Sequence, residues 1–399
     1  MLTRRAFGML PAARALAAVD FPQWRGPNRD GVVGSVKLPA AWPDKLTRKW
    51  RMAVGEGHAS PVMSGGRLYV FARQSENEIL RAVEPATGKV IWTSSNAAPY
   101  TVNPAATKHR KGPKSTPLVI GGRVVALGIS GILSVHDAAT GKVLWRKEFG
   151  KEFRETSPLY GAAMSPIVVD GLVIAHVGGD GGGALTAFDL AAGAVRWKWS
   201  EDGPGYASPV AVTVAGKRQV VTQSEKSIVS VDPKDGKVVW KIPFTTPYAQ
   251  NSVTPLVFGD KLILSGLSNG TMCVDSAGKV VWHNKEVGMY MNSPVVAGET
   301  IYGFTNRNRG QYFAMSARDG RLLWSSEPRK GDNAAILLAG DLLFLLNTDA
   351  ELIVAKASPA SFQVVKTYAV AESETWAHPL VLTEGIVVKD FEALTLWTV

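Results

Sequence analysis

A turn built on glycine, followed a few residues later by tryptophan, recurs six times in this chain of 399 residues. The copies are EPATGKVIW (Glu84–Trp92), DAATGKVLW (Asp137–Trp145), DLAAGAVRW (Asp189–Trp197), DPKDGKVVW (Asp232–Trp240), DSAGKVVW (Asp275–Trp282) and SARDGRLLW (Ser316–Trp324). Successive tryptophans are 53, 52, 43, 42 and 42 residues apart. This period is typical of a four-stranded propeller blade and not of a helical repeat, so it predicts a β-propeller.

Each copy also has the local sequence of a β-hairpin. An apolar strand runs into the turn, where Asp can bond to its own backbone and Gly supplies a positive φ. A strand rich in Val, Leu and Ile follows and ends near the tryptophan. Each copy therefore predicts a strand, a tight turn and a second strand.

A second repeat is interleaved with the first. It consists of a small polar residue or histidine followed by proline, at Ser60-Pro61, Thr116-Pro117, Ser165-Pro166, Ser208-Pro209, Thr254-Pro255, Ser293-Pro294 and His378-Pro379. A copy without proline lies near Ala334-Ala335. Because proline is tolerated where a strand begins, we expect these positions to open the innermost strands. Eight strand starts predict eight blades.

The ring is expected to close through its own N-terminus. Trp50 stands 42 residues before Trp92 without a hairpin before it, and no strand follows the last hairpin, 385–399. We therefore predict an all-β, eight-bladed β-propeller of four-stranded antiparallel blades over residues 45–399, closed by an N-terminal strand around Trp50. Tyr368 is expected to replace the tryptophan in blade seven. The structural repeat then comprises Trp50, Trp92, Trp145, Trp197, Trp240, Trp282 and Trp324.

The N-terminus has the features of an export signal. The segment 3–7 contains the twin-arginine pattern, a weakly apolar stretch follows, and Ala15-Leu16-Ala17 offers a cleavage site. We predict a signal peptide at 1–17, an N-terminal extension at 18–44, and a soluble protein that is periplasmic or otherwise exported. No segment approaches the ~18 consecutive apolar residues of a membrane span. No cysteine lies near the cleavage site, which argues against a lipoprotein anchor.

Composition excludes several chemistries. The only cysteine, Cys273, lies in the predicted strand TMCVD, where we expect a small buried side chain. An intrachain disulfide, a four-cysteine zinc site and a haem attached through cysteines are therefore excluded. The net charge of +10 falls to about +7 without the three arginines of the predicted signal. This charge suits an acidic partner, but no nucleic-acid motif accompanies it, and we expect a monomer.

Strand order predicts which rim of the propeller binds a ligand. The loops that lead into the inner strands share a rim with the middle hairpins, opposite the glycine turns. This rim has the long loops 93–115 and 146–165, and long loops on a rigid scaffold often carry binding sites. Its basic residues form the predicted binding set: Lys108, His109, Arg110, Lys111, Lys114, Lys151, Arg154, Arg307 and Arg309. They predict a site for an anionic ligand or an acidic protein surface, with solvated loop charge as the equal alternative.

Two histidines complete the set of candidate binding residues. His58 and His378 precede the inner strands of blades one and eight, which are neighbours across the closure, so both could face the axis. A metal site needs three or four ligands, and no acidic pair stands beside these histidines. We expect a hydrogen-bonded structural role for them, and no metal site, catalytic residue or bound cofactor.

The repeat D-x-x-T-G-K-x-x-W resembles the tryptophan-docking repeat of the pyrroloquinoline-quinone (PQQ) propeller family, over about 355 residues. The segment FPQWRGPNRDGV, at 21–32, is similar to the leader of exported proteins of this family. The resemblance implies one of two kinds of relative. These are the quinoprotein alcohol dehydrogenases and the non-catalytic BamB-type scaffold of outer-membrane protein assembly.

This chain departs from what the resemblance implies for the dehydrogenases. Many of them have a vicinal cysteine pair over the quinone, which a single cysteine excludes, and some add a haem domain. A calcium ion normally bridges the quinone and a catalytic Asp, and no such acidic set is identifiable. We therefore expect a non-catalytic exported propeller that binds an envelope protein or an anionic ligand, similar to BamB. The alternative is a PQQ-dependent alcohol or sugar dehydrogenase that holds PQQ and calcium. The sequence is also compatible with a third class, a propeller that senses small anions or polysaccharide, but contains no specific feature of it.

Overall fold

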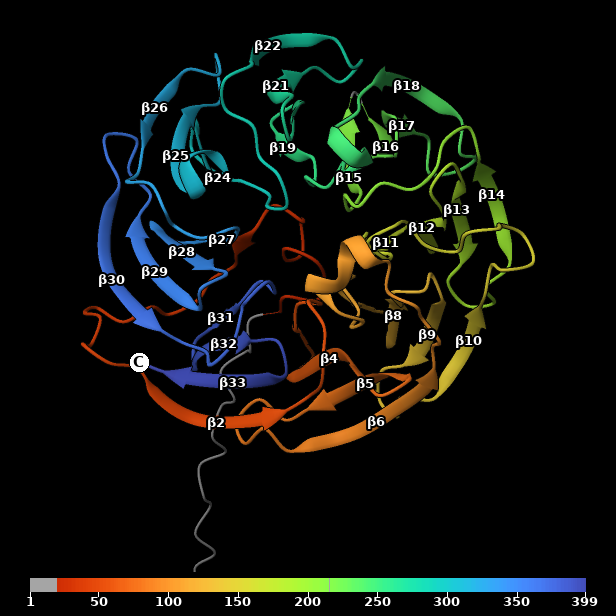
Figure 1. Ribbon diagram of the computed structural model, residues 1–399, viewed down its shortest axis with the longest axis horizontal. Helices are drawn as coiled ribbons and strands as arrows, with labels where there is room; N and C mark the ends of the chain where they lie inside the picture. The colour runs from red at the N-terminus through yellow and green to blue at the C-terminus, as the bar shows by residue number, and fades with distance from the viewer. Residues whose placement is uncertain (1–19, 215) are drawn as a thin grey trace, which may run out of the picture.

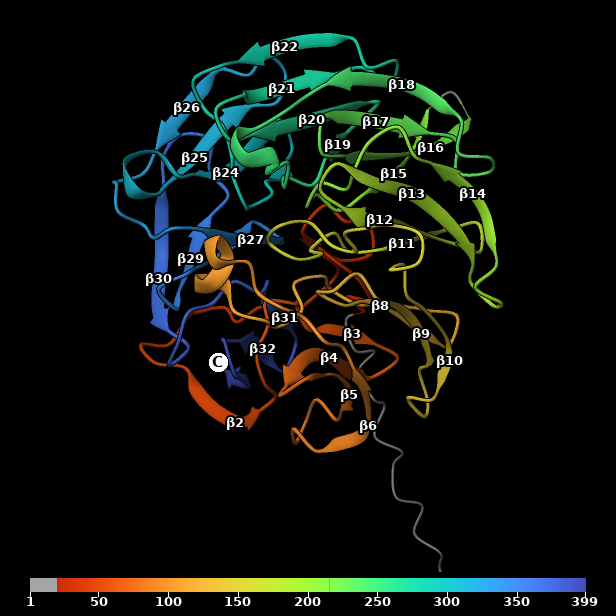
Figure 2. The same ribbon diagram turned by 45° about the vertical axis from the view of Figure 1, so that its right-hand side comes forward.

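The computed structural model describes residues 20–214 and 216–399, and the predicted signal peptide at 1–17 lies outside them. Eight sheets surround a central axis, each built on four antiparallel strands, and the short strand β1 (Val32–Val33) adds a fifth, parallel strand to one of them (Figures 1 and 2). This confirms the predicted all-β, eight-bladed propeller. The described helices are three short 3₁₀ turns, η1 (Pro104–His109), η2 (Pro247–Ala249) and η3 (Arg307–Arg309). None of the described helices is long and apolar enough to cross a membrane.

The strands of blades one to four follow one another from the axis to the periphery. Blade one consists of β3 (Val62–Ser64), β4 (Arg67–Gln74), β5 (Asn77–Val83) and β6 (Val90–Ala97), and blade two of β7 (Leu118–Ile120), β8 (Arg123–Leu127), β9 (Leu133–Asp137) and β10 (Val143–Lys147). Blade three consists of β11 (Ile167–Val169), β12 (Leu172–Gly179), β13 (Gly182–Asp189) and β14 (Val195–Trp199), and blade four of β15 (Val210–Val214), β16 (Lys217–Gln223), β17 (Ser227–Val231) and β18 (Val238–Pro243).

Blades five to seven repeat this order, and blade eight takes its outer strand from the N-terminus. Blade five consists of β19 (Leu256–Phe258), β20 (Lys261–Gly266), β21 (Gly270–Val274) and β22 (Val280–Asn284), and blade six of β23 (Val295–Ala297), β24 (Thr300–Thr305), β25 (Gln311–Ser316) and β26 (Leu322–Ser325). Blade seven consists of β27 (Ala334–Ala339), β28 (Leu342–Asn347), β29 (Glu351–Lys356) and β30 (Gln363–Ala369), and blade eight of β31 (Leu380–Leu382), β32 (Gly385–Lys389), β33 (Ala393–Thr398) and β2 (Thr47–Ala53). In blade eight, β2 is antiparallel to β33, with Trp50 opposite Leu396.

The Ser/Thr-Pro repeat forms a partial ring of hydrogen bonds around the axis. The Ser60 N–H donates to the Thr116 hydroxyl at 3.1 Å, and the Thr116 N–H donates to the Ser165 hydroxyl at 2.9 Å. Equivalent bonds join Ser165 to Ser208, Thr254 to Ser293 and His378 to Ser60, at 2.9, 3.0 and 2.9 Å. At these five junctions the following blade satisfies a buried N–H of the preceding blade. A buried backbone donor left without a partner would be costly.

The tryptophan repeat joins neighbouring blades near the periphery. The Trp92 ring packs on Gly141 of the next blade, where a Cβ would come within 2.4 Å of the ring and where φ is +76°. Both the space and the backbone conformation therefore require glycine. The Trp92 Nε1–H donates to the Ala138 carbonyl at 3.1 Å. The same donor bond is made by Trp50, Trp145, Trp197, Trp282 and Trp324 at 2.8–3.0 Å.

Blade seven lacks a docking tryptophan on its outer strand, β30. In β30 the register position of the tryptophans, next to the bulge, is taken by Lys366 opposite Val354, so the prediction that Tyr368 takes it is wrong by two residues. The Lys366 ammonium donates to the Asp44 carboxylate at 2.6 Å, and the Tyr368 hydroxyl donates to the Pro43 carbonyl at 2.7 Å. In blade eight the third and fourth strands come from opposite ends of the chain. No glycine turn therefore joins them, and a tryptophan has nothing to pack on.

The apolar core lies between adjacent blades. One cluster combines Met63 of blade one, Leu337 of blade seven and Val387 of blade eight, so it spans the closure of the ring. Another contains Cys273, which is buried, as the sequence predicts, between blades five and six. Each sheet thus buries both faces against its neighbours, and this burial of apolar area stabilises the ring.

The N-terminal segment 20–33 lies along the axis, against the inner strands (red in Figure 1). Phe21 and Met63 of blade one exchange backbone hydrogen bonds at 2.8 and 3.0 Å. The Val119 N–H of blade two donates to the Pro22 carbonyl at 2.8 Å. The short strand β1 (Val32–Val33) pairs in parallel with β27 of blade seven. The segment therefore bonds to three blades through its backbone alone.

Two buried arginines of this segment bond to three further blades. The Arg25 guanidinium donates to the Ser293 carbonyl of blade six at 2.8 Å. The Arg29 guanidinium donates to the Ser165 carbonyl of blade three at 3.0 Å and to the Pro209 carbonyl of blade four at 2.9 Å. Burial lowers the pKa of Arg29 to about 9. These side chains satisfy carbonyls at the start of the inner strands, which a ring of β-strands alone would leave without donors.

Trp24 connects the segment to the two remaining blades. Its Nε1–H donates to the Thr254 hydroxyl of blade five at 2.9 Å. Its ring lies edge-on to His378 of blade eight, with 4.5 Å between centroids. The segment 20–33 thus contacts all eight blades, and we call it the axial segment.

We expect Arg29→Met to lower the free energy of unfolding by about 3 kcal/mol, because several buried carbonyls lose a charged donor. Urea unfolding followed by circular dichroism measures this change. Arg154→Met is the matched control, since the Arg154 side chain is 97% exposed. An equal effect of the two substitutions would contradict the role assigned to Arg29.

Glu78 of β5 is a buried carboxyl at the junction of blades one and two. Its side chain accepts a hydrogen bond from the Ile129 N–H at 2.7 Å and lies so close to Gly128 that no Cβ could fit there. Burial raises the pKa of Glu78 to about 7, against the opposing effects of the Ile129 bond and the Arg73 charge. The folded protein therefore holds a proton on Glu78 that the unfolded chain loses near pH 4.5.

The stability that this proton contributes is fully present below about pH 4.5 and is lost as the pH rises to about 7. We expect Glu78→Gln to be more stable than the native chain by up to about 3 kcal/mol at about pH 8, and the difference to vanish near pH 4.5. Urea midpoints of both proteins at several pH values measure it. The buried histidines titrate equally in both proteins and cancel in the difference. A pH-independent difference would contradict the assignment.

Candidate functional site

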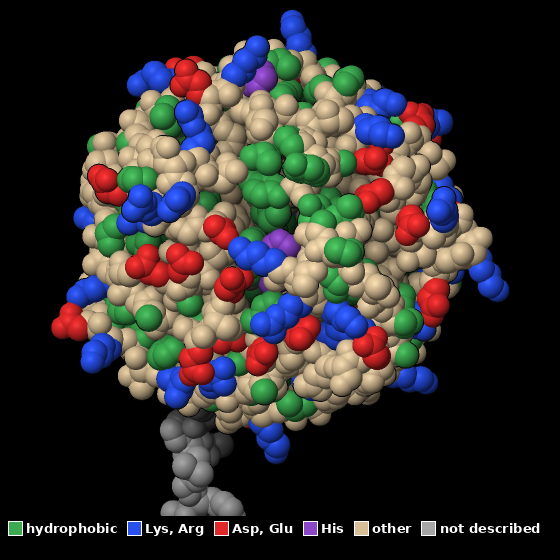
Figure 3. Space-filling model, in the orientation of Figure 1, with side chains coloured by type: hydrophobic (Ala, Val, Ile, Leu, Met, Phe, Trp, Pro, Cys, Tyr) green, Lys and Arg blue, Asp and Glu red, His purple; other side chains and the backbone are tan. Residues whose placement is uncertain are grey.

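An open cavity lies at the axis, on the rim formed by the loops that join one blade to the next. Figure 3 shows hydrophobic and histidine side chains around this hollow at the centre of the face. All eight inter-blade loops contribute to its wall, with His58, His109, Lys114, Tyr160, Ala163, Tyr206, Ser208, Gln250, Ser252, Thr254, Met291, Asn333 and Trp376. These residues lie in the loops that lead into the inner strands, and most of them stand within a few residues of a strand start.

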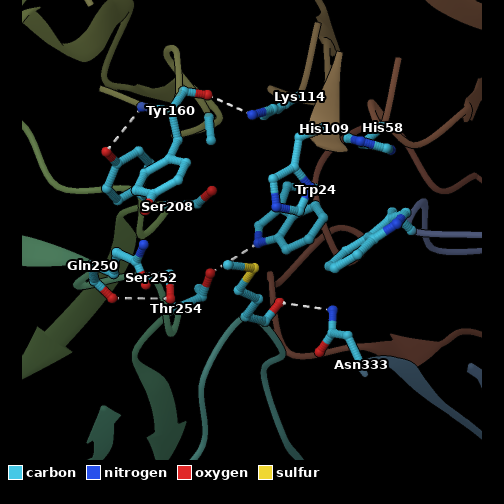
Figure 4. Close-up of a pocket in the computed structure, with 14 residues that line it drawn as sticks. Trp24, His58, His109, Lys114, Tyr160, Ser208, Gln250, Ser252, Thr254 and Asn333 are labelled. Atoms are coloured by element: carbon cyan, nitrogen blue, oxygen red, sulfur yellow. Dashed lines mark hydrogen bonds between the residues drawn. The ribbon is translucent and has the colours of Figure 1, made fainter. Parts of the chain in front are cut away.

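The axial segment provides the floor of the cavity through Trp24 (Figure 4). The hydrogen bond from Trp24 to Thr254 and the contact with His378 hold this ring across the axis. His378 lies beneath Trp24 and is buried, with its backbone N–H bonded to Ser60. Of the two histidines expected to face the axis, only His58 lines the cavity.

One side of the cavity is aromatic. The His109 ring lies edge-on to Trp376 at 5.1 Å and to His58 at 6.0 Å, measured between centroids. Tyr160 and Tyr206 pack against each other at 5.9 Å on the adjacent wall. Aromatic rings in such edge-to-face contacts hold one another in fixed orientations. Their faces therefore offer a rigid apolar surface to a ligand.

The opposite side of the cavity carries hydroxyl and amide groups (Figure 4). The Gln250 side-chain oxygen accepts a bond from the Tyr290 hydroxyl, and the Ser252 hydroxyl donates to the Tyr290 carbonyl. The Asn333 amide nitrogen donates to the Met291 carbonyl at 3.2 Å. These bonds fix the side chains and leave the Gln250 amide nitrogen without a partner among the described residues.

Lys114 is the cation of the cavity wall. Its ammonium donates to the Tyr160 carbonyl, and no carboxylate of the described residues lies within ion-pair distance. Burial lowers the pKa of Lys114 to about 8. Burial, with the Lys114 and Lys108 charges, lowers the pKa of His109 to about 4, and burial holds the pKa of His58 well below its ordinary value. At pH 7 the cavity therefore has one largely charged lysine and two neutral histidines.

The other predicted basic residues lie outside the cavity. Four are paired with carboxylates: Lys108 with Asp332 (2.7 Å), Arg110 with Glu392 (3.5 Å), Lys111 with Glu76 (3.4 Å) and Arg154 with Glu155 (3.9 Å). Arg307 donates to the Glu286 carbonyl at 2.7 Å, while Lys151 and Arg309 are exposed. Exposed ion pairs contribute little to stability, but here each places a negative charge beside a positive one. The rim around the cavity therefore alternates in sign (Figure 3).

The predicted binding set includes His58 and His109 of the cavity wall and misses the aromatic residues Trp24, Tyr160, Tyr206 and Trp376. A short pattern could have identified three positions of the cavity wall: an aromatic ring, Ala, then Ser or His before the strand-opening proline. His58, Tyr206 and Trp376 all stand in this pattern. Trp24 carried no such signal, because only the folded axial segment brings it to the floor of the cavity.

The donor set of the cavity does not fit a PQQ–calcium centre. Calcium is held by several oxygen ligands, usually with carboxylates among them. The described wall residues include no Asp or Glu, and the described residues contain no group of three or more His, Cys, Asp or Glu that could hold a metal ion.

The tryptophan docking, the eight blades and the axial cavity define a propeller of the PQQ-like class. The family described as "Outer membrane protein assembly factor BamB" matches residues 75–326, more than half of the chain. The chain therefore belongs to this family of PQQ-like β-propellers.

Individual relatives agree with this assignment. The outer membrane protein assembly factor BamB of Yersinia pestis is 25% identical over 279 residues, which cover 64% of this chain and 63% of that protein. The chain thus spans less than two thirds of this relative. The BamB of Shewanella oneidensis is 23% identical over 297 residues, 69% of this chain and 70% of that protein.

Solved structures show the same fold in proteins of both kinds. BamB from Moraxella catarrhalis has a TM-score of 0.65 at 14% identity, covering 89% of this chain and 100% of that one. The quinohemoprotein alcohol dehydrogenase from Comamonas testosteroni has a TM-score of 0.69 at 16% identity, covering 95% of this chain and 80% of that one. Likeness at such low identity concerns the fold alone.

Proposed function

We propose that this chain is a non-catalytic exported β-propeller that binds a partner of the cell envelope on the rim around its axial cavity. The observation that carries the proposal is the cavity itself, to which all eight inter-blade loops contribute. Family membership supports an envelope role, and the twin-arginine pattern of the N-terminus supports export. The absence of carboxylates from the described cavity wall supports binding over calcium-dependent catalysis.

The loop before blade five supports a protein partner. Tyr248 is 86% exposed, the most exposed large hydrophobic residue described, and it stands two residues before Gln250 of the cavity wall. Tyr248 and Ala249 both have left-handed backbone, with φ of 60° and 53°. Non-glycine residues in this conformation cost energy and gather at functional loops. Tyrosine is also enriched among the residues that dominate protein interfaces.

We expect Tyr248→Ala to reduce retention of the envelope partner roughly tenfold or more, because the interface loses its exposed aromatic anchor. Immobilised protein is incubated with an envelope extract of its source, and retained proteins are quantified by mass spectrometry. Val239→Ala, at an outer-strand residue that is 49% exposed, is the control and should retain the partner fully. Equal retention by all three proteins, or no retention by the native one, would refute the protein partner proposed for this rim.

The dehydrogenase alternative is tested on the same protein. PQQ and Ca²⁺ are added, and bound-quinone absorbance and alcohol- or sugar-dependent dye reduction are measured. We expect neither stoichiometric quinone binding nor turnover, since the cavity wall lacks the oxygen ligands that calcium takes. Stoichiometric binding with turnover would replace the scaffold proposal with the enzymatic one.

A further inference from the structure

The cavity wall contains a cation whose charge the described residues do not balance. The Lys114 ammonium has three N–H donors, and the described residues provide one acceptor, the Tyr160 carbonyl. Lys108 and Lys111, on the same loop, each have a carboxylate partner on the rim. A half-buried charge without a counter-ion is costly, so the cavity favours a ligand that brings an anionic group to Lys114.

The aromatic surfaces of the cavity favour a ring. Trp24 forms the floor and Trp376 one wall, with Tyr160 and Tyr206 beside them. The electron-rich face of an aromatic ring attracts the positive edges of C–H groups as well as other rings. A small linear acid would satisfy Lys114 and leave these surfaces uncovered.

The polar wall distinguishes between kinds of ring. The Gln250 amide nitrogen has no partner among the described residues, and the Ser208 hydroxyl, which accepts from the Ser165 N–H at 2.9 Å, donates to no described residue. An aromatic acid would leave these groups unpaired, which disfavours it. The hydroxyl groups of a sugar both donate and accept, and they match an amide and a hydroxyl.

We propose that the axial cavity binds an acidic sugar of the uronate type, free or at the end of a glycan. The ring covers Trp24 and Trp376, the carboxylate faces Lys114, and the hydroxyls face the wall of Gln250 and Ser208. This inference names a ligand for the cavity of the proposed function and rests on that binding role. The described wall has no carboxylates and therefore lacks the pair of acids that most glycoside hydrolases use.

Isothermal titration calorimetry at ~150 mM salt tests the proposal with glucuronate, glucose and benzoate. We expect glucuronate to bind roughly tenfold or more tightly than either of the others, because only glucuronate satisfies Lys114, the rings and the polar wall together. Lys114→Met should reduce the affinity for glucuronate to that for glucose. Lys111→Met, at the ion-paired lysine three residues earlier, should leave it unchanged. Circular dichroism confirms that both variants are folded.

Several outcomes would overturn the proposal. These are equal binding of glucuronate and glucose, tighter binding of benzoate, a native affinity in Lys114→Met, or no binding of any uronate. A further titration with trigalacturonate distinguishes the end of a glycan from a free sugar as the ligand. Binding of the trimer alone assigns the ligand to a glycan. Binding of glucuronate as well shows that the cavity also takes the free sugar. Partner retention that depends on Tyr248, with no uronate binding, would overturn this inference alone. Uronate binding without partner retention would overturn only the protein-partner part of the proposed function.

Discussion

The packing of a tryptophan on the glycine turn of the following blade is the interaction on which the rest of the structure depends. It joins sheets that share no strand. The contact lies near the periphery of the propeller, where neighbouring blades are farther apart than at the axis. At Gly141 the contact is so close that no other residue fits, and the indole N–H also caps a carbonyl of the same turn. One interaction therefore fixes both the distance and the angle between two blades. Repetition around the circle then determines how many blades close it.

The axial segment solves a problem that this docking creates. A ring held at its periphery leaves the starts of eight inner strands around a central space, with carbonyls that point into it. The Ser/Thr hydroxyls accept bonds from backbone N–H groups at these strand starts. The carbonyls of three blades are satisfied by Arg25 and Arg29. Because the segment occupies the axis, the hollow on the rim has a floor, Trp24, and is a cavity in place of an open channel. The axial segment thus both stabilises the ring and forms the floor of the cavity.

The sequence predicted the regular part of the molecule well because that part is local. A turn, a strand start and a 42-residue period each lie within a few residues or one blade, so their physical meaning can be read in place. The prediction of Tyr368 in place of the tryptophan was wrong because this position does not depend on a local pattern. The register at Lys366 is determined by a bulge, and the missing glycine turn of blade eight follows from which strand closes the ring.

The cavity could not be predicted in the same way, because its residues come together from loops across the whole chain. Trp24 bonds to a residue 230 positions away. Its place on the axis follows from the contacts that the whole axial segment makes with the eight blades. The basic residues were visible in the sequence, but their partners were not. Whether a lysine is balanced, as Lys108 is by Asp332, or unbalanced, as Lys114 is, depends on which loops meet in space.

This division between ring and loops has a consequence for specificity. A change at a docking tryptophan or its glycine disturbs two blades and, through the circle, the closure of the ring. A change at a cavity residue such as Trp376 or Gln250 alters one loop and leaves the contacts between blades in place. The chemistry of the cavity can therefore vary while the fold is preserved. That the BamB structure and the alcohol dehydrogenase structure both share this fold fits such a separation, since the fold does not determine what the axis holds.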